Sequence, residues 1–389
     1  MNSHALPGAD RPLRILLVTT GLRMGGAEQQ VAALAREFIA RGNRVALISL
    51  TPDCEVPMPD AVERLMLDMR KTPTSMAQAL AAARHFASQW QPDIVNSHMF
   101  HANMFARVLS RIAALPPLIC AAHSFSEGGR LRMTLYRLTN RWCTVTTQVS
   151  KTSCAEMIRA GAVTSDRVRV MYNGIDTAKF QPDAELRERT RAQLGIDANT
   201  RLVLNIGRLA AEKAQVALID AFQQMDRSAP ARLLIAGDGP QRPALEARIA
   251  HHNLGDQITL LGTRHDIPAL LNAADLFVLS SRVEGMPLVI GEALACQCPV
   301  VSTAAPGVAE LMGDFGVMVP VDDIGALART MHHALATEDR ASAQRRIGRE
   351  RIIQHFGIAA AADRWLALYH ELGDSTAGQP GHARPCAGA

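Results

Sequence analysis

Short apolar runs alternate with longer amphipathic segments along most of the chain. In the first half, the runs that predict β-strands lie at residues 13–19, 44–50, 93–97, 118–122, 144–150 and 167–172. The intervals have helical spacing, most clearly residues 27–42. The apolar stripe of that segment consists of Val31, Leu34, Ala35, Phe38 and Ile39. Apolar strands that alternate with helices predict a parallel sheet covered on both faces.

The same pattern restarts in the second half of the chain. Its strand candidates lie at residues 201–207, 231–239, 257–262, 275–281, 298–303 and 316–320. A polar segment, NGIDTAKFQPD, followed by the charged segment AELRERTRAQLG, separates the halves and suits a hinge. We therefore predict an α/β fold of two doubly wound, Rossmann-like parallel-sheet domains that face each other across a cleft.

The predicted domains span residues 1–182 and residues 183–372. Two further helices are expected after Arg351, and the last of them, at about 358–372, is expected to pack back on the first domain. The tail 373–389 is polar and rich in glycine and proline, which predicts disorder.

Composition narrows the classes of protein that this chain can represent. It has 389 residues, which favours two domains, and its 48% hydrophobic and 20% charged content is typical of a soluble globular protein. The aromatic content of 4% argues against stacking platforms for nucleic acid. Seven scattered cysteines without a CxxC pair indicate reduced cytosolic thiols and no zinc site. The only apolar stretch near the N-terminus, residues 15–18, is too short for a secretory signal or a membrane span.

Glycines follow two of the predicted strands. Gly25 and Gly26, in GLRMGGAE, would let a ligand approach the backbone at the start of a helix, although a plain strand-to-helix turn would also use them. Gly237 and Gly239 repeat this arrangement ahead of a helix expected near Pro240. Neither run is GxGxxG, so a nicotinamide dehydrogenase is disfavoured.

Two acids, Glu284 and Glu292, lie eight positions apart in EGMPLVIGEA. In a helix this spacing is roughly 12 Å, so the two acids could bind opposite ends of a sugar nucleotide. A carboxylate can accept two hydrogen bonds from hydroxyl groups. Glu284 could equally be a common first-turn acid. Glu292 lies in an apolar segment where an ionised group needs a partner. The positions between them that are candidates for substrate binding are Gly285, Met286, Pro287 and Leu288.

Two cations, Arg208 and Lys213, follow the first strand of the second half in IGRLAAEK. Together they could neutralise a diphosphate and stabilise it as a leaving group. Surface salt bridging is the alternative for either residue alone. The chain contains no DxD triplet, so we expect no metal and no cofactor beyond the co-substrate.

Taken together and in this order, these motifs resemble the retaining glycosyltransferases of the family 4 type, which have the GT-B fold. The resemblance covers nearly the whole chain. It implies that Glu292 holds the ribose diol of the donor, that Glu284 contacts the donor sugar, and that Arg208 and Lys213 bind the diphosphate. It also places Gly25 and Gly26 on the acceptor side of the cleft.

Histidines complete the site that the resemblance implies. His123 matches the histidine that such enzymes place beside the transferred sugar, and a polar loop histidine is the alternative. His98 and His101, which we expect at a helix start, are weaker candidates for acceptor contacts, because such histidines are often caps or polar core groups. Asn173 is expected to turn the chain toward the second domain.

The implied reaction moves a hexosyl or N-acetylhexosaminyl group from a nucleotide sugar to a glycan or glycolipid of cell-surface polysaccharide or lipopolysaccharide. Family frequency favours a UDP-sugar, and the preferred mechanism is front-face attack with the departing diphosphate as base. The alternatives are a sugar-nucleotide epimerase or phosphorylase of the same fold, and a non-catalytic binding subunit. The chain departs from the family pattern at Gln297, which replaces a glycine, and at Pro306, which stands where the first of two paired glycines is expected. These two substitutions reduce backbone freedom near the donor pocket and leave the donor sugar and the activity open. Ala214, where glycine or asparagine is more usual, is a milder departure.

Charge is concentrated between Phe100 and Lys151. Seven bases there, Arg107, Arg111, Arg130, Arg132, Arg137, Arg141 and Lys151, face one acid, Glu127. In LRMTLYRLTNRWC they interleave with apolar residues, which is compatible with peripheral binding to the anionic inner face of the cytoplasmic membrane. A solvated basic helix is the alternative, and no nucleic-acid module is recognised.

Overall fold

The chain forms two compact units. The structure, a computed structural model, describes residues 11–23, 25–125, 129–226, 229–337 and 341–377. Unit 1 contains the described residues up to Val149, together with Ser153–Gly174 and the chain from Ile358 onward. Unit 2 contains Ile175–Gly357 and the short piece Ser150–Thr152.

The sequence pattern placed the boundary between the units after residue 182. The structure places it earlier, between Gly174 and Ile175. Residues 175–182 belong to unit 2 because they are bonded into it. The guanidinium of Arg349 donates to the carbonyl oxygen of Phe180 at 2.8 Å, and the side chain of Asn272 donates to that of Gln181 at 3.0 Å. This segment is therefore a strap that is bonded to unit 2, with Ile175 and Phe180 buried, rather than a free hinge.

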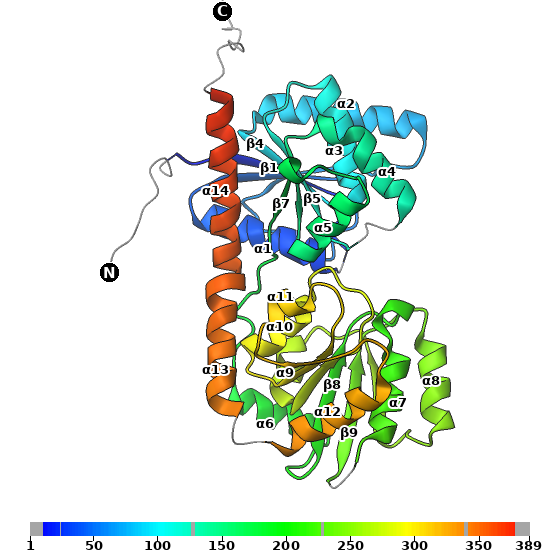
Figure 1. The fold of residues 1–389 in the computed structure, drawn as a ribbon. Coiled ribbons are helices and arrows are strands. Elements are labelled where there is room, and N and C mark those ends of the chain that lie inside the picture. The colour runs from blue at the N-terminus through cyan, green and yellow to red at the C-terminus, as the bar shows by residue number, and fades with distance from the viewer. Residues whose placement is uncertain (1–10, 24, 126–128, 227–228, 338–340, 378–389) are drawn as a thin grey trace, which may run out of the picture. The chain divides into compact units, whose positions relative to one another are not determined.

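Unit 1 is built on a parallel sheet of seven strands in the order β3-β2-β1-β4-β5-β6-β7 (Figure 1). The strands are β1 (Arg14–Thr19), β2 (Arg44–Ser49), β3 (Glu63–Met66), β4 (Ile94–His98), β5 (Leu118–Ala122), β6 (Val145–Gln148) and β7 (Val168–Val170). The sequence pattern missed β3. This edge strand, ERLM, is exposed or half-buried along its length and contains no buried apolar run.

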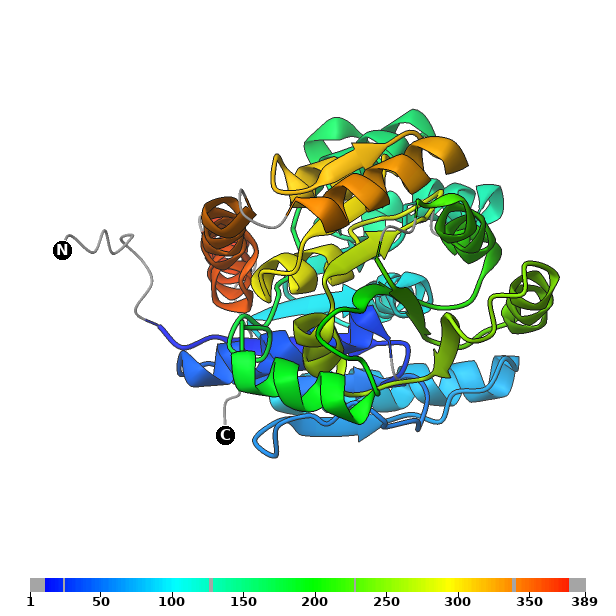
Figure 2. The same cartoon turned by 90° about the horizontal axis from the view of Figure 1, so that it is seen from below.

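Helices cover both faces of this sheet (Figure 1 and Figure 2). The helices of unit 1 are α1 (Gly26–Ala40), α2 (Pro73–Trp90), α3 (Phe100–Ile112), α4 (Arg130–Thr139), α5 (Lys151–Arg159) and α14 (Ile358–Ala377). Short 3-10 turns lie at η1 (Asn140–Trp142) and η2 (Ser165–Arg167). Residues of α1 and α14 share one core with one face of the strands, and residues of α2 and α3 share another core with the opposite face.

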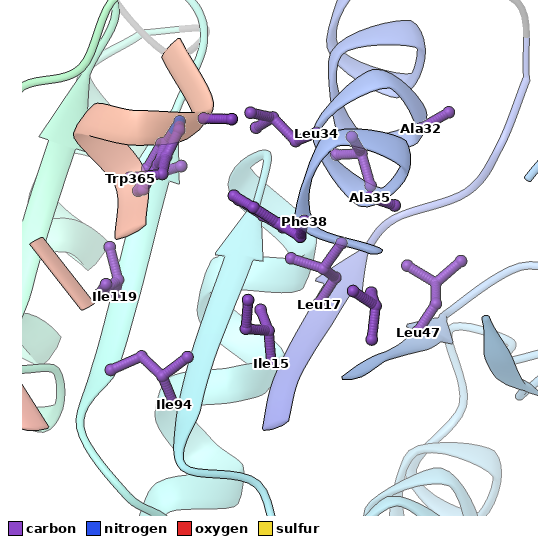
Figure 3. Close-up of a cluster of buried hydrophobic side chains, with 14 of the residues drawn as sticks. Ile15, Leu17, Ala32, Leu34, Ala35, Phe38, Leu47, Ile94, Ile119 and Trp365 are labelled. Atoms are coloured by element: carbon purple, nitrogen blue, oxygen red, sulfur yellow. The ribbon is translucent and has the colours of Figure 1, made fainter. Parts of the chain in front are cut away.

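The last described helix, α14, is part of unit 1 although it follows unit 2 in the sequence. Trp365 and Tyr369 are 3% and 1% exposed and pack in the core with Phe38 of α1, as Figure 3 shows for Trp365. The Tyr369 hydroxyl accepts a hydrogen bond of 2.6 Å from the Asn96 side chain on β4. The sequence pattern expected two helices after Arg351, whereas the structure has a π-helical turn, Ile352–Phe356, and then the single helix α14.

The first residues of the tail 373–389, which the sequence predicts to be disordered, are helical. Helix α14 continues to Ala377, and residues 378–389 lie outside the described residues. Glu127 of the basic segment also lies outside them.

Unit 2 repeats the design with six parallel strands in the order β10-β9-β8-β11-β12-β13. They are β8 (Arg201–Ile206), β9 (Ala231–Ala236), β10 (Ile258–Gly262), β11 (Leu276–Leu279), β12 (Val300–Thr303) and β13 (Val317–Val319). All six coincide with the predicted apolar runs. The alternating layers of parallel strands and helices confirm the predicted α/β fold class.

The helices of unit 2 again cover both faces of the sheet (Figure 1). They are α6 (Ala184–Gln193), α7 (Gln215–Gln224), α8 (Arg242–His251), α9 (Ile267–Ala273), α10 (Leu288–Ala295), α11 (Val308–Met312), α12 (Ile324–Ala336) and α13 (Ala341–Arg351), with a 3-10 turn η3 (Ala211–Lys213). Residues of α7, α8 and α12 share a core with one face of the strands. Helices α9 and α10 contact the central strands β8 and β11.

Trp365→Ala should destabilise unit 1 strongly. Removing a large buried ring leaves a cavity and costs about 3–5 kcal/mol of the free energy of unfolding. Urea unfolding followed by circular dichroism measures this loss. Ala367→Ser, at an exposed position of the same helix, is the matched control and should change the free energy by less than about 0.5 kcal/mol. Equal stability of the two variants would contradict the assignment of α14 to the core.

Candidate functional site

Two strands of unit 2 end side by side where the strand order reverses. β8 and β11 are neighbours, but the chain continues from β8 to β9 on one side and from β11 to β12 on the other. In open parallel sheets, ligands bind beyond the carboxyl ends of the strands at such a point. The loop after β8 carries Arg208 and Lys213, and the loop after β11 carries Glu284.

An ion pair joins these two loops. The Lys213 ammonium lies 2.7 Å from a carboxylate oxygen of Glu284, and the two side chains are 24% and 9% exposed. Backbone bonds hold the loops in this register. The Ser280 hydroxyl donates to the carbonyl oxygen of Lys213 at 2.9 Å, and the amide of Arg282 donates to that of Glu212 at 2.8 Å. Two residues that are 71 positions apart in sequence are thus brought into one site.

The second predicted cation is paired locally. Arg208 lies 2.7 Å from Glu212, and both side chains are largely open to solvent. Glu212 was missed by the sequence analysis, although its spacing of four residues from Arg208 is the spacing of such pairs. An exposed pair of this kind is weak, about 0–1 kcal/mol, so an incoming anion can displace the carboxylate.

Gly237 and Gly239 bring the loop after β9 against the loop after β8. Both have positive φ, 136° and 155°. A Cβ atom at Gly237 would lie 2.0 Å from the carbonyl oxygen of Gly207, and one at Gly239 would lie 2.5 Å from that of Leu209. These glycines are therefore required by the close approach of two backbones, and they shape the loop that carries Arg208. The helix that follows begins at Arg242, slightly later than expected.

The loop between Glu284 and helix α10 is also closely packed. Met286 is 9% exposed, Pro287 precedes the helix and Leu288 is its first residue. Gly307 has φ 80°, and a Cβ there would lie 2.2 Å from the carbonyl oxygen of Gly285. Pro306 replaces the first glycine of the family pair, but the second, Gly307, is the one whose backbone requires glycine.

Glu292 lies inside α10, two turns beyond Glu284 in sequence. Burial raises the pKa of Glu292 to about 7, and the charge of Lys179 opposes this shift. Among the described residues, no side chain or backbone group is hydrogen-bonded or ion-paired to its carboxylate. A partly buried acid without a partner is unfavourable unless a ligand completes it.

Gln297 lies at the other end of α10. It has φ 57°, and its amide donates to the carbonyl oxygen of Leu294 at 3.0 Å, while the amide of Cys298 donates to that of Ala293 at 2.9 Å. This is the left-handed position after a helix that favours glycine. The substitution of the family glycine by Gln297 thus affects a helix end, not the loop of Glu284, which corrects the expectation that it restricts the donor pocket.

Gln297 lines a hollow of about 440 Å³ that is separate from the loop of Glu284. The hollow lies at the amino ends of the strands of unit 2, where Arg201, Asp275 and Pro299 line it together with Gln297. None of the predicted site residues lines this hollow.

Ala214, the milder departure from the family pattern, has the same kind of strain. It adopts φ 49° and ψ 36°, directly between Lys213 and α7. The left-handed conformation explains why glycine or asparagine suits this position.

In unit 1, His98 and His123 form a pair at the corresponding edge of the sheet. His98 is the last residue of β4 and is fully buried, so it is not at a helix start as expected. Its Nδ1 lies 3.0 Å from Nε2 of His123, which follows β5. Burial lowers the pKa of His98 well below its ordinary value, an effect that the nearby His123 reinforces, and burial lowers the pKa of His123 to about 4. Both rings are therefore neutral at pH 7.

The turn after His98 is strained. Met99 has φ 74° and ψ 156°, a conformation that residues other than glycine avoid, and it occurs repeatedly at functional sites. His101, in the first turn of α3, is exposed and is not part of the pair. The sequence did not reveal the pairing because the two histidines are 25 positions apart.

The remaining candidates of unit 1 lie near the start of α1 and near its boundary. Gly25 precedes α1 and Gly26 is its first residue, as expected. A Cβ at Gly25 would lie 2.3 Å from a carboxylate oxygen of Glu28, whose pKa burial raises. Asn173 is 8% exposed and lies next to Gly174, the last residue of this part of unit 1.

No metal centre is formed by the part of the chain that the structure describes. Groups of three or more histidine, cysteine, aspartate or glutamate side chains placed to hold an ion do not occur among those residues. Likewise, no described helix combines the length and the apolar character that crossing a membrane requires.

Comparison with known families matches both parts of the chain. Residues 187–351 match the family model "Glycosyl transferases group 1", and residues 24–179 match the model "Glycosyltransferase Family 4". The α-D-kanosaminyltransferase of Streptomyces kanamyceticus is 30% identical over 56% of this chain and 58% of that protein. The UDP-Gal:α-D-GlcNAc-diphosphoundecaprenol α-1,3-galactosyltransferase of Escherichia coli is 26% identical over 72% of this chain and 76% of that protein.

Solved structures resemble the fold along most of the chain. HepE of Anabaena, solved in complex with UDP and also with UDP-glucose, superposes with TM-scores of 0.80 and 0.78. In the UDP complex it is 23% identical, and the match covers 92% of this chain and 100% of that chain.

Gln297→Gly should stabilise unit 2. The left-handed conformation costs a residue with a Cβ about 1 kcal/mol of conformational free energy. The free energy of unfolding should therefore be higher by about 1 kcal/mol in Gln297→Gly than in Gln297→Ala. Urea unfolding of the two variants beside the parent measures the difference. If alanine were as stable as glycine at this position, the strain assigned to Gln297 would be disproved.

Proposed function

Because the chain belongs to the glycosyltransferases of the family 4 type with the GT-B fold, we propose that it transfers a sugar, with retention of configuration, from a UDP-sugar to a glycan or lipid-linked acceptor. The observation that carries this proposal is the site at the carboxyl ends of β8 and β11. There, Lys213 and Arg208 lie on one loop and are paired with the carboxylates of Glu284 and Glu212.

Two cations at a strand end suit a diphosphate. In the free protein their charges are balanced by acids, so the loop is preformed without leaving an uncompensated buried charge. A bound diphosphate takes up the same cations through charge-assisted hydrogen bonds. Glu284 is then available to accept hydrogen bonds from the donor sugar.

The carboxylate of Glu292 suits the ribose diol. It is partly buried, and no described residue is bonded to it. A vicinal diol would donate two hydrogen bonds to this group, which favours its ionised form and lowers its pKa on binding. Gly237 and Gly239 keep the neighbouring loop close to the backbone of Gly207 and Leu209.

The reaction is a displacement at the anomeric carbon. The bond from that carbon to the diphosphate oxygen breaks, the bond to the acceptor oxygen forms on the same face, and the hydroxyl proton passes to the departing diphosphate. Arg208 and Lys213 stabilise the negative charge that grows on the diphosphate. Glu284 and Glu292 orient the donor, which supplies catalysis through positioning.

The relatives support this choice of donor and acceptor. The complexes of HepE with UDP and UDP-glucose support a uridine nucleotide. The galactosyltransferase of Escherichia coli acts on a diphosphoundecaprenol-linked sugar, and a relative in Rhizobium meliloti, 31% identical, is a lipopolysaccharide core mannosyltransferase. We therefore propose an acceptor of cell-surface glycan synthesis at the cytoplasmic side of the membrane. The neutral pair His98 and His123 supplies polar groups on the acceptor side in unit 1.

Nucleotide binding should depend on pH through Glu292. Below about pH 7 its carboxyl group is protonated, and above this value it becomes a stronger acceptor for the ribose hydroxyls. Affinity for UDP, measured by calorimetry with guanosine and adenosine diphosphates as comparisons, should therefore rise between pH 6 and 8. In Glu292→Gln it should be weaker and independent of this titration. Equal affinity for all three nucleotides, or an unchanged pH profile in the variant, would contradict the assignment.

Turnover should fall when either cation is removed. Arg208→Ala and Lys213→Met should each lower kcat by about 10²–10³-fold, because each removes stabilisation of charge in the transition state. Arg264→Ala is the matched control, since this arginine is also paired with a nearby acid, Asp266, after a strand of the same sheet. Release of UDP that requires an acceptor is the readout. Unchanged turnover in both site variants would overturn the mechanism.

A further inference from the structure

The outer face of α4 exposes large apolar side chains. Leu131 is 75% exposed and Leu138 is 61% exposed. They are seven residues apart, so both lie on one face of the helix, two turns from each other. The opposite face is anchored, because Met133 and Tyr136 are 6% and 0% exposed. The leucines are therefore presented to solvent by a helix whose inner side is fixed.

Arginines flank these leucines. Arg130, Arg137 and Arg141 are exposed and follow the same helical spacing into η1. None of the three forms an ion pair with a described residue. The sequences of α3, α4 and η1 contain no aspartate or glutamate. This face thus combines unpaired positive charge with exposed hydrocarbon.

The structure changes which bases belong to the surface. Arg107 is fully buried, and its guanidinium donates to the Tyr136 carbonyl oxygen at 3.1 Å and to the Thr139 hydroxyl at 2.9 Å. Arg132 is only half-buried and stacks 4.7 Å from the ring of Phe100. Arg107 therefore anchors the inner side of α4 through these two hydrogen bonds, and it contributes no charge to the outer face.

Exposed apolar side chains also occur on α3, the helix that packs next to α4. Helix α3 packs against α4 on one side and against α2 on the other. Val108 and Ile112 are 40% and 44% exposed, with the exposed Arg111 between them. Ile112 also borders a hollow of about 450 Å³, whose apolar lining comes from α2 through Ala77, Leu80 and Ala81.

We propose that the outer face of α4 docks on an anionic lipid bilayer. Leucines that enter the acyl boundary, with arginines at the level of the phosphates, are the arrangement by which a helix lies in a membrane interface. The absence of acids on these elements removes repulsion from anionic headgroups. The proposal rests on the proposed function only in that a lipid-linked acceptor gives docking its purpose.

The test measures binding of the full-length protein to vesicles by sedimentation, without donor or acceptor. Vesicles of phosphatidylglycerol and phosphatidylcholine should bind the protein, and vesicles of pure phosphatidylcholine should bind it weakly. The triple variant Arg130→Gln, Arg137→Gln, Arg141→Gln should lose about 100-fold in affinity, from roughly fivefold for each arginine. The variant Leu131→Ser, Leu138→Ser should lose at least about tenfold.

A charge-matched control separates this face from net charge. Arg36, Arg189 and Arg346 are exposed arginines on other helices, and changing all three to Gln removes the same charge. This control should bind vesicles nearly as well as the parent. Absence of parent binding, or equal losses in the control and the α4 variants, would overturn the proposal, as would self-association through the leucines without vesicle binding. UDP affinity, measured on the same proteins, should be unchanged and tests the proposed function separately.

Discussion

The ion pair between Lys213 and Glu284 is the interaction on which the site of unit 2 depends. It joins the loops that leave β8 and β11, the two strands between which the order of the sheet reverses. Because Glu284 is 9% exposed, either charge alone would be costly in that position. The pair therefore fixes both loops before any ligand binds, and it presents a cation that an anionic ligand can share.

Most of the fold was predictable because parallel strands covered on both faces leave a strong signal. Every strand of unit 2 coincides with an apolar run, and in unit 1 only β3 was missed, since its residues are not buried. The boundary of the units was displaced because a polar composition does not distinguish a hinge from a strap that is bonded to a domain. Burial of charge was equally invisible, and Arg107 was counted as a surface base although it lies in the core.

The candidate site was predictable as a set of residues but not as a set of contacts. Motif spacing identified Arg208, Lys213 and Glu284. The structure adds two ion pairs, one between Lys213 and Glu284 and one between Arg208 and Glu212. The sequence shows Gln297 and Ala214 only as departures from the family pattern. The backbone of the structure shows that both residues adopt positive φ. Of the two paired glycines in the family pattern, the chain retains Gly307, where a Cβ atom would clash with the backbone of Gly285.

The placement of α14 has a consequence for how the molecule is made. Unit 2 is nearly continuous in sequence, whereas the core of unit 1 needs Trp365 and Tyr369 from the last described helix. During synthesis, the part of unit 1 up to Gly174 emerges early but lacks these two rings until Tyr369 has left the ribosome. Unit 2 can therefore complete its core while the unit that was translated first still waits, reversing the usual amino-terminal-first order of domain folding.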